Sequence, residues 1–253
     1  MNFLKNKNVW IILLIVLLLI LIFFSSAKII AYIVDGKKTD RVYDEIREAY
    51  LDNGLETNAK DGLNTNEDNL YYKKAEFLLG INKNTAGWIS ILGTKVDYPV
   101  LRGDDNIHYL KYNLEEKRSS RGSIMMDYRN AGDSRDLNIT IYGHNMKDDS
   151  MFHDLISYKD RAFFELYPKV QFDTLERAGE YSIFSVYVAD SIEDNIKINF
   201  SDEIEYSEYL ESVKNLSLYD CEIEVNASDR ILTLTTCTYE KKGANLIIHA
   251  KLN

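Results

Sequence analysis

The sequence has little proline, little cysteine and fewer basic than acidic residues. These shortages limit the classes of protein to which the chain can belong. Only 2 of its 253 residues are proline and only 2 are cysteine. Its 30 basic side chains stand against 40 acidic ones, which gives a net charge of −10. A nucleic-acid-binding protein needs clustered Lys and Arg to neutralise phosphates, so the composition argues against that class. The sequence also contains no internal repeat and no low-complexity tract.

The two cysteines, Cys221 and Cys237, allow one intramolecular disulfide bond at most. They could form it in an oxidising compartment. That bond would remove the only strong nucleophile candidate in the chain, and we expect two free thiols instead.

The clearest feature that is present is an unbroken apolar run from Val9 to Phe24, preceded by Lys5 and Lys7. With the next three residues it approaches the roughly 20 that a helix needs to cross a bilayer. The small residues after it resemble a signal-peptidase site, but the run is longer than the usual h-region of about 7 to 15 residues. We therefore predict a retained signal-anchor over residues 9–27, with residues 1–8 in the cytoplasm and the remainder outside the cell. Lysines flank both ends, so this orientation depends on the N-terminal place of the segment and not on the charge count.

Between the anchor and the main domain the sequence predicts two helices and a linker. Apolar residues at helical spacing predict a helix over residues 39–51, with Thr39 as its cap. Residues 52–69 are rich in Asn, Asp, Gly and Thr, which is typical of a flexible loop. A second short helix is expected over residues 70–79. We assign residues 28–86 to this helical region and residues 87–253 to one domain.

In that domain, short runs of β-branched and aromatic residues predict a mainly β fold. Strands are expected at residues 88–92, 96–101, 122–127, 138–142, 169–175, 181–188, 222–225, 230–236 and 245–252. Helices are expected at residues 151–156, 161–166 and 202–215, the last with Ser201 as its cap. This many short strands with few helices is typical of a β-barrel or a sandwich.

Two of the predicted strands end at a residue suited to nucleophilic chemistry. The alternation in the strand that leads to Cys237 predicts one buried face. Leu232 and Leu234 share one face of this strand, and the cysteine lies on the opposite face. His144 follows the strand at residues 138–142 with the same alternation. A thiol is nucleophilic as its thiolate, and a nearby imidazole can favour that form or move protons. The two strand ends could therefore bring a cysteine–histidine pair to one groove.

Each of these residues also has an ordinary interpretation. Free cysteine is among the most buried residue types, so Cys237 could be a structural thiol. A single histidine after a strand is more often a loop residue, and we interpret His108, His153 and His249 in that way. The pattern alone leaves both alternatives open.

Five segments together resemble the class B sortases. They are YGHNM at residues 142–146, TLTTCTYE at 233–240, LIIHAKL at 246–252, DYPV at 97–100 and RGSIMMDYR at 121–129. The resemblance covers about residues 87–252, and the anchor and helical N-terminal region are in keeping with it.

The resemblance implies a membrane-anchored cysteine transpeptidase on a closed eight-stranded sortase-type β-barrel, with a helix in the loop before the last strands. Members of the family cleave a sorting signal near the C-terminus of a secreted protein, after its threonine. Cys237 would form a thioester with the threonine carbonyl, and His144 would act as general acid and then as general base. An amine of peptidoglycan or of its lipid-linked precursor would resolve the thioester. The resemblance implies no metal and no other cofactor.

The resemblance also assigns substrate contacts to Asn106, Leu110, Tyr142 and Thr235, although each has a structural interpretation, such as core packing for Leu110. The family's third catalytic residue is an arginine, and this chain has Asn245 at its position. Asparagine keeps an amide donor but loses the charge and the reach, and such donors can be worth about 10²- to 10³-fold in rate. A cation could come from elsewhere, and the candidates are Lys241, Lys242, Arg102, Arg121 and Arg230.

Three functions remain open at this point. The first is a class B sortase that anchors a surface protein to peptidoglycan. The second is a thiol hydrolase, in which water accepts the acyl group. The third is a sortase-fold domain that binds peptides without turnover, which the departure at Asn245 keeps open. The expected partners are a sorting-signal peptide, a peptidoglycan amine and the membrane, without nucleic acid.

Overall fold

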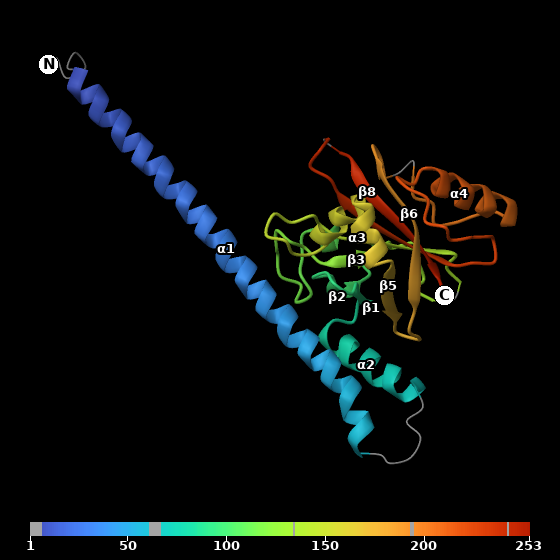
Figure 1. Ribbon diagram of the computed structural model, residues 1–253. Coiled ribbons are helices and arrows are strands. Elements are labelled where there is room, and N and C mark those ends of the chain that lie inside the picture. The colour runs from blue at the N-terminus through green and yellow to red at the C-terminus, as the bar shows by residue number, and fades with distance from the viewer. Residues whose placement is uncertain (1–6, 61–66, 134, 193–194, 242) are drawn as a thin grey trace. The chain divides into compact units, whose positions relative to one another are not determined.

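The computed structural model describes residues 7–60, 67–133, 135–192, 195–241 and 243–253 (Figure 1). Its contacts divide the chain into two compact units, one that ends at Asp44 and one that begins at Glu45. The first unit holds the N-terminal part of helix α1 (Lys7–Lys60). Every side chain from Trp10 to Phe24 is exposed, and one 18-residue window of this helix has a mean hydropathy of 3.2. In the described part of the chain, this is the one helix long and apolar enough to cross a membrane.

Helix α1 is longer than the sequence predicted. It contains both the predicted anchor and the predicted helix at residues 39–51. Thr39 lies inside it, where its hydroxyl donates to the carbonyl of Asp35 at 2.9 Å, so it does not cap a helix. The loop predicted at residues 52–69 is wrong at both ends, because residues 52–60 belong to α1 and residues 67–69 to α2 (Glu67–Ile81). Residues 61–66 lie outside the described part.

The reason for this long helix is a shortage already visible in the sequence. The first proline is Pro99, so no residue of α1 lacks the N–H that a helix requires. Asparagine, aspartate and threonine lower helix propensity by only a fraction of a kcal/mol each, whereas proline costs about 3 kcal/mol. A polar composition alone was therefore a weak reason to predict a loop.

The second unit contains a closed β-barrel of eight strands, which confirms the predicted fold. The strands are β1 (Thr85–Ser90), β2 (Asp97–Leu101), β3 (Ile124–Met126), β4 (Asn138–Tyr142), β5 (Lys169–Thr174), β6 (Glu180–Ala189), β7 (Ile231–Cys237) and β8 (Asn245–Leu252). Around the barrel they follow the order β1-β2-β3-β4-β7-β8-β6-β5. The pairs β2·β3 and β4·β7 are parallel, and the other pairs are antiparallel.

Helix α4 (Glu203–Asn215), in the connection between β6 and β7, packs on the outside of the barrel (Figure 1). Its buried residues Tyr206 and Leu210 belong to one apolar cluster with Ile231 of β7 and Ile247 of β8. Strand β7 is therefore buried on both faces as far as Thr236, whereas the sequence predicted one buried face.

The cap of α4 is Asp202 and not the predicted Ser201. The Asp202 carboxylate accepts from the backbone N–H of Glu205 at 2.9 Å. The Ser201 hydroxyl instead donates to the carboxylate of Glu205 at 2.6 Å.

The predicted strand at residues 222–225 is wrong. Ile223 and Val225 alternate because they pack against the cluster under α4, and they do not belong to a ladder. Glu222 has a φ of 55°, a left-handed conformation that does not continue a strand.

The described part of the barrel unit also contains three short helices. They are η2 (His108–Leu110), η3 (His153–Lys159) and α3 (Arg161–Leu166). The prediction at residues 161–166 is confirmed, and the helix predicted at residues 151–156 is a 3₁₀ helix that begins two residues later.

The parallel pairing of β4 with β7 determines where reactive side chains can meet. The register aligns Asn138 with Ile231 and Tyr142 with Thr235. Since parallel strands end at the same edge of a sheet, the residues that follow Tyr142 and Thr235 leave the barrel side by side.

Candidate active site

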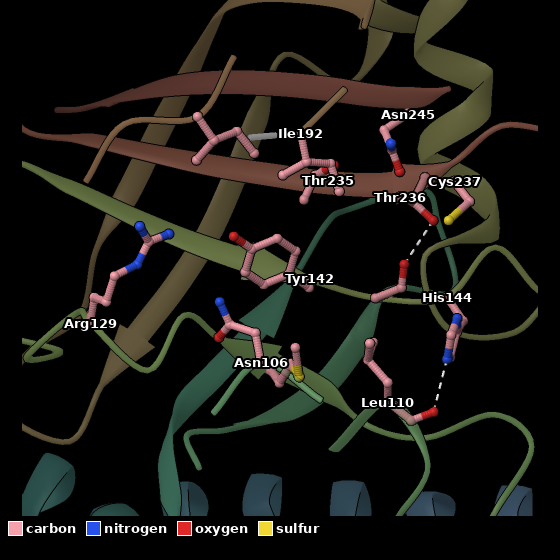
Figure 2. A pocket seen from close by; sticks show the side chains of 13 residues that line it. Asn106, Leu110, Arg129, Tyr142, His144, Ile192, Thr235, Thr236, Cys237 and Asn245 are labelled. Carbon is pink, nitrogen blue, oxygen red and sulfur yellow. Dashed lines mark hydrogen bonds between the residues drawn. The ribbon is translucent and has the colours of Figure 1, made fainter. Parts of the chain in front are cut away.

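One pocket of about 530 Å³ lies where the C-terminal ends of β4 and β7 meet (Figure 2). All seven residues with a predicted site role line it: Asn106, Leu110, Tyr142, His144, Thr235, Cys237 and Asn245. They come from segments far apart in the sequence, since Leu110 belongs to η2, Tyr142 to β4 and Asn245 to β8.

Cys237 and His144 come from the two neighbouring strand ends. Cys237 is the last residue of β7 and is exposed, while the residues of that strand before it are buried. His144 lies two residues after β4 and is partly exposed. The hydroxyl of Thr236 donates to the carbonyl of Gly143 at 2.8 Å, which joins the two segments directly beside the pair.

The tautomer of His144 follows from its hydrogen bond. Its Nε2 lies 2.9 Å from the backbone carbonyl oxygen of Leu110. A carbonyl oxygen can only accept, so Nε2 carries the proton and donates it. The other ring nitrogen, Nδ1, is then the one that can exchange a proton in the pocket (Figure 2).

The second thiol has a different environment. Cys221 and Cys237 are both free, which confirms that prediction. Cys221 is buried, its Sγ lies 3.9 Å from the Ser217 hydroxyl, and burial raises the pKa of its thiol. Of these two cysteines, Cys237 lines the pocket that also contains His144, and Cys221 does not.

A buried carboxylate, Asp127, arranges the other end of the pocket. It accepts from Asn106 Nδ2 at 2.7 Å, from the Tyr142 hydroxyl at 2.8 Å and from Arg129 Nη2 at 2.8 Å. Burial alone would raise the pKa of Asp127, but these hydrogen bonds outweigh it and hold the pKa below its usual value. Burial and the nearby Asp127 charge raise the pKa of Tyr142, so its hydroxyl stays protonated and donates.

Arg129 and Asp127 are charged residues at this pocket that the sequence did not predict there. Arg129 is the only Lys or Arg among the described residues that line the pocket, and its side chain is 43% exposed. Figure 2 shows it across the pocket from Cys237, with Tyr142 between them. Both residues belong to the RGSIMMDYR segment, so the signal was present, but only the fold shows that this segment reaches the pocket.

The cations considered for the absent arginine lie elsewhere. Among the described residues, neither Lys241, Arg102, Arg121 nor Arg230 lines the pocket, and Lys242 lies outside the described part. Lys241 pairs with Asp190, and Arg121 pairs with Asp148. Asn245 does line the pocket, but its Nδ2 donates to the carbonyl of Gly243 at 2.9 Å.

Thr235 lines the pocket and carries a buried hydroxyl. The residue is 1% exposed, and its hydroxyl has no hydrogen-bond partner among the described residues. A buried hydroxyl without a partner carries a desolvation cost of about 1–3 kcal/mol, which a bound ligand could remove. The described residues contain no group of three or more His, Cys, Asp or Glu arranged to hold a metal ion.

Comparison with known proteins agrees with this geometry. A model of the sortase domain matches residues 89–253. The chain is 34% identical over 230 residues to sortase B of Listeria monocytogenes, which covers 90% of each protein.

Solved structures agree as well. A crystal structure of sortase B from B. anthracis in complex with AAEK1 matches with a TM-score of 0.74 and 34% identity, over 87% of this chain and 98% of that one. A Staphylococcus aureus sortase B–substrate complex matches with a TM-score of 0.76 and 28% identity, again over 87% and 98%. The sequence, the barrel and the pocket thus lead to one conclusion: this chain belongs to the sortase B family of cysteine transpeptidases.

Proposed function

We propose that this protein cleaves the C-terminal sorting signal of a secreted surface protein after a threonine and joins the product to a peptidoglycan amine. The observation that carries the proposal is the placement of His144 and Cys237 in one pocket, at the ends of two adjacent parallel strands. The likeness to a sortase B–substrate complex supports a sorting-signal peptide as the ligand of that pocket.

The first half-reaction forms a thioester. The Cys237 thiolate attacks the threonine carbonyl carbon, a C–S bond forms and the carbonyl oxygen becomes an oxyanion. As the C–N bond breaks, Nδ1–H of the His144 imidazolium gives its proton to the leaving amine. The hydrogen bond from Nε2 to Leu110 keeps the ring in one orientation during this transfer.

The second half-reaction reverses these roles. An incoming amine attacks the thioester carbonyl and loses a proton to His144 Nδ1. The C–N bond forms, the C–S bond breaks, and Cys237 leaves as its thiolate. A covalent intermediate of this kind allows the two substrates to react in turn.

The peptide would lie along the side of the pocket that holds Thr235, Tyr142 and Asn106. The unpartnered Thr235 hydroxyl supports a hydrogen bond to the peptide there. The Arg129 guanidinium is a further donor, because its contacts with Asp127 leave 43% of the side chain exposed. Leu110 would supply an apolar contact on the opposite wall.

Asn245 favours a second candidate, a sortase-fold domain that binds peptides without turnover. One of the two N–H donors of its amide is engaged by Gly243, and the amide carries no charge, so it would stabilise an oxyanion less than an arginine would. The third candidate, a thiol hydrolase, needs the same acyl-enzyme and differs only in the acceptor.

The N-terminal helix supports a place at the membrane. We propose that residues 9–27 anchor the chain, that residues 1–8 lie in the cytoplasm, and that the region of residues 28–86 and the barrel of residues 87–253 lie outside the cell. The exposed apolar surface from Trp10 to Phe24 supports the anchor, because water solvates such a surface poorly.

The test is single-turnover acylation of the full-length protein in detergent, with a panel of threonine-containing sorting peptides. Mass spectrometry would measure a thioester on Cys237 in the wild type, in Cys237→Ala, in Asn245→Arg and in the control Cys221→Ser. We expect an adduct in the wild type and in Cys221→Ser, and none in Cys237→Ala. Addition of a small amine should then convert the adduct to an amide faster than water hydrolyses it.

Each alternative has its own outcome. Release by water at an unchanged rate in the presence of amine would favour the hydrolase. An adduct that forms in Asn245→Arg but not in the wild type would favour the binding domain. An adduct that persists in Cys237→Ala would overturn the assigned nucleophile.

A further inference from the structure

The ladder between β4 and β7 ends just before the two residues that must work together. Its last aligned pair is Tyr142 with Thr235, and Gly143 N–H adds one bond to the Thr235 carbonyl at 3.2 Å. Backbone pairing therefore does not fix His144 relative to Cys237. Something else must hold the two strand ends together at this edge.

Beyond the end of the ladder, hydrogen bonds that involve side chains connect the two segments, and Asn145 takes part in two of them. Its Nδ2 donates to the backbone carbonyl of Cys237 at 2.9 Å, across 92 positions of sequence. Its own backbone carbonyl accepts from the hydroxyl of Tyr239, two residues after the cysteine. The residue directly after the histidine thus holds the nucleophile's own peptide unit.

A second histidine orients the Asn145 amide. The carbonyl of Cys237 can only accept, so the amide must place Nδ2 toward it and Oδ1 toward the other side. On that side His153 Nδ1 lies 2.8 Å from Oδ1 and therefore carries a proton that it donates. His153 Nε2 lies 3.3 Å from a carboxylate oxygen of Asp149, and it can donate to that oxygen when the ring carries both protons.

The loop that carries these groups is itself tightly wound. Asp149 and Met151 have φ values of 61° and 58°, a region that costs non-glycine residues energy. Asn145 forms an isolated antiparallel bridge with Met151, and the Phe152 N–H donates to the His144 carbonyl at 2.9 Å. The loop thereby folds back on the histidine and brings His153 to Asn145.

We infer that Asn145 is a positioning residue for the reaction, which fixes the Cys237 backbone relative to His144, and that His153 keeps its amide in the working orientation. This rests on the proposed roles of Cys237 and His144. Asn145 does not line the pocket, so it acts through the pair and not on the peptide. A displacement of about 1 Å between reacting groups can cost about 100-fold in rate, and this is the effect expected when the bond is lost.

The experiment uses the full-length protein in detergent and an acylation assay with one threonine-containing sorting peptide. Asn145→Ala removes both hydrogen bonds, and Asn145→Asp keeps the acceptor for His153 but loses the donor to Cys237. We expect both variants to lower the saturating acylation rate by about 10- to 100-fold, with KM changed less than about threefold. Alkylation of Cys237 by iodoacetamide at a pH that fully ionises the thiol should stay near the wild-type rate, because the thiol remains exposed.

His153 gives a rescue test that a purely structural role would not pass. The amide nitrogen of asparagine can take the place of the imidazole Nδ1, so His153→Asn keeps a donor for Asn145, whereas His153→Leu does not. We expect His153→Asn to keep most of the acylation rate and His153→Leu to lose about tenfold.

Asn82→Ala is the matched control. Asn82 is as buried as Asn145, at 7% exposed, and it does not line the pocket. Like Asn145, its Nδ2 donates to a distant backbone carbonyl, that of Leu114; it also donates to the Glu116 carboxylate, and its Oδ1 accepts from the Asn84 N–H. It should lose stability as Asn145→Ala does while keeping its acylation rate. Equal acylation rates in Asn145→Ala and the wild type would overturn the inference, as would equal losses in Asn145→Ala and Asn82→Ala. If the wild type itself forms no thioester, the proposed function fails instead, and the two failures are distinct.

Discussion

Asp127→Asn tests whether one buried charge organises the peptide side of the pocket. Asp127 is fully buried, and its two carboxylate oxygens accept hydrogen bonds from Asn106, Tyr142 and Arg129. Oδ2 accepts from Asn106, Tyr142 and Arg129 Nη2, while Oδ1 accepts from Arg129 Nε at 2.9 Å and from the Arg129 backbone N–H at 3.0 Å. An asparagine has one acceptor oxygen, so its NH2 group must face donors on one of the two sides.

The loss of stability is smaller if the asparagine oxygen of the variant occupies the Oδ2 position. The variant then loses the two hydrogen bonds from Arg129 to Oδ1, and each bond to a charged acceptor contributes about 1.5–3 kcal/mol. The exposed part of Arg129 is screened by water, which lowers the sum. We expect the free energy of unfolding to fall by about 2–4 kcal/mol at pH 7.

The measurement is urea denaturation of the full-length protein in detergent at pH 7 and at pH 3. Because the folded-state pKa of Asp127 is lowered, its stabilising contribution is complete above about pH 3.9 and is lost as the pH falls below that value. The difference between wild type and variant should therefore shrink at pH 3. The matched control is Asp133→Asn. Asp133 accepts from the backbone N–H, Nε and Nη2 of Arg135, two residues later, as Asp127 does from Arg129. The Arg135 side chain is 78% exposed, so water screens this pair far more. If Asp127→Asn is no less stable than Asp133→Asn, the reasoning is refuted.

Two further predictions concern buried groups. Burial lowers the pKa of His249 to about 3, so the unfolded chain binds a proton below about pH 6.5 that the folded protein excludes. Between pH 7 and pH 5, the free energy of unfolding of the wild type should therefore fall by about 2 kcal/mol more than that of His249→Asn. Urea denaturation at the two pH values measures this difference. Gly122→Ala should lower the free energy of unfolding by about 2–5 kcal/mol and shift η2, because the φ of Gly122 is +58° and the new Cβ would lie 2.5 Å from the Tyr109 carbonyl oxygen. Gly243→Ala should lower it by only about 1–2 kcal/mol, because Gly243 has a φ of +87° but lies in open space. Similar melting temperatures for the two variants would contradict this.

The sequence by itself determined the features that depend on local pattern. The apolar run from Val9 to Phe24 predicted a helix able to span a membrane, because that property depends only on composition and length. Period-2 alternation predicted β4, β7 and β8 within one or two residues. The motifs around His144 and Cys237 then indicated the family, because each motif is a short contiguous segment.

The tertiary structure decided what depends on contacts between distant segments. The pattern in β7 predicted one buried face, and only the packing of α4 shows that the second face is covered as well. Arg129 enters the pocket because β3 lies beside β4, and no local signal in the sequence states that pairing. The hydrogen bond from Asn145 to Cys237 spans 92 positions and exists only because β4 and β7 are parallel neighbours. Alternation tells which face a side chain takes, but strand order and register place two side chains together, and these are set by the free energy of the whole barrel.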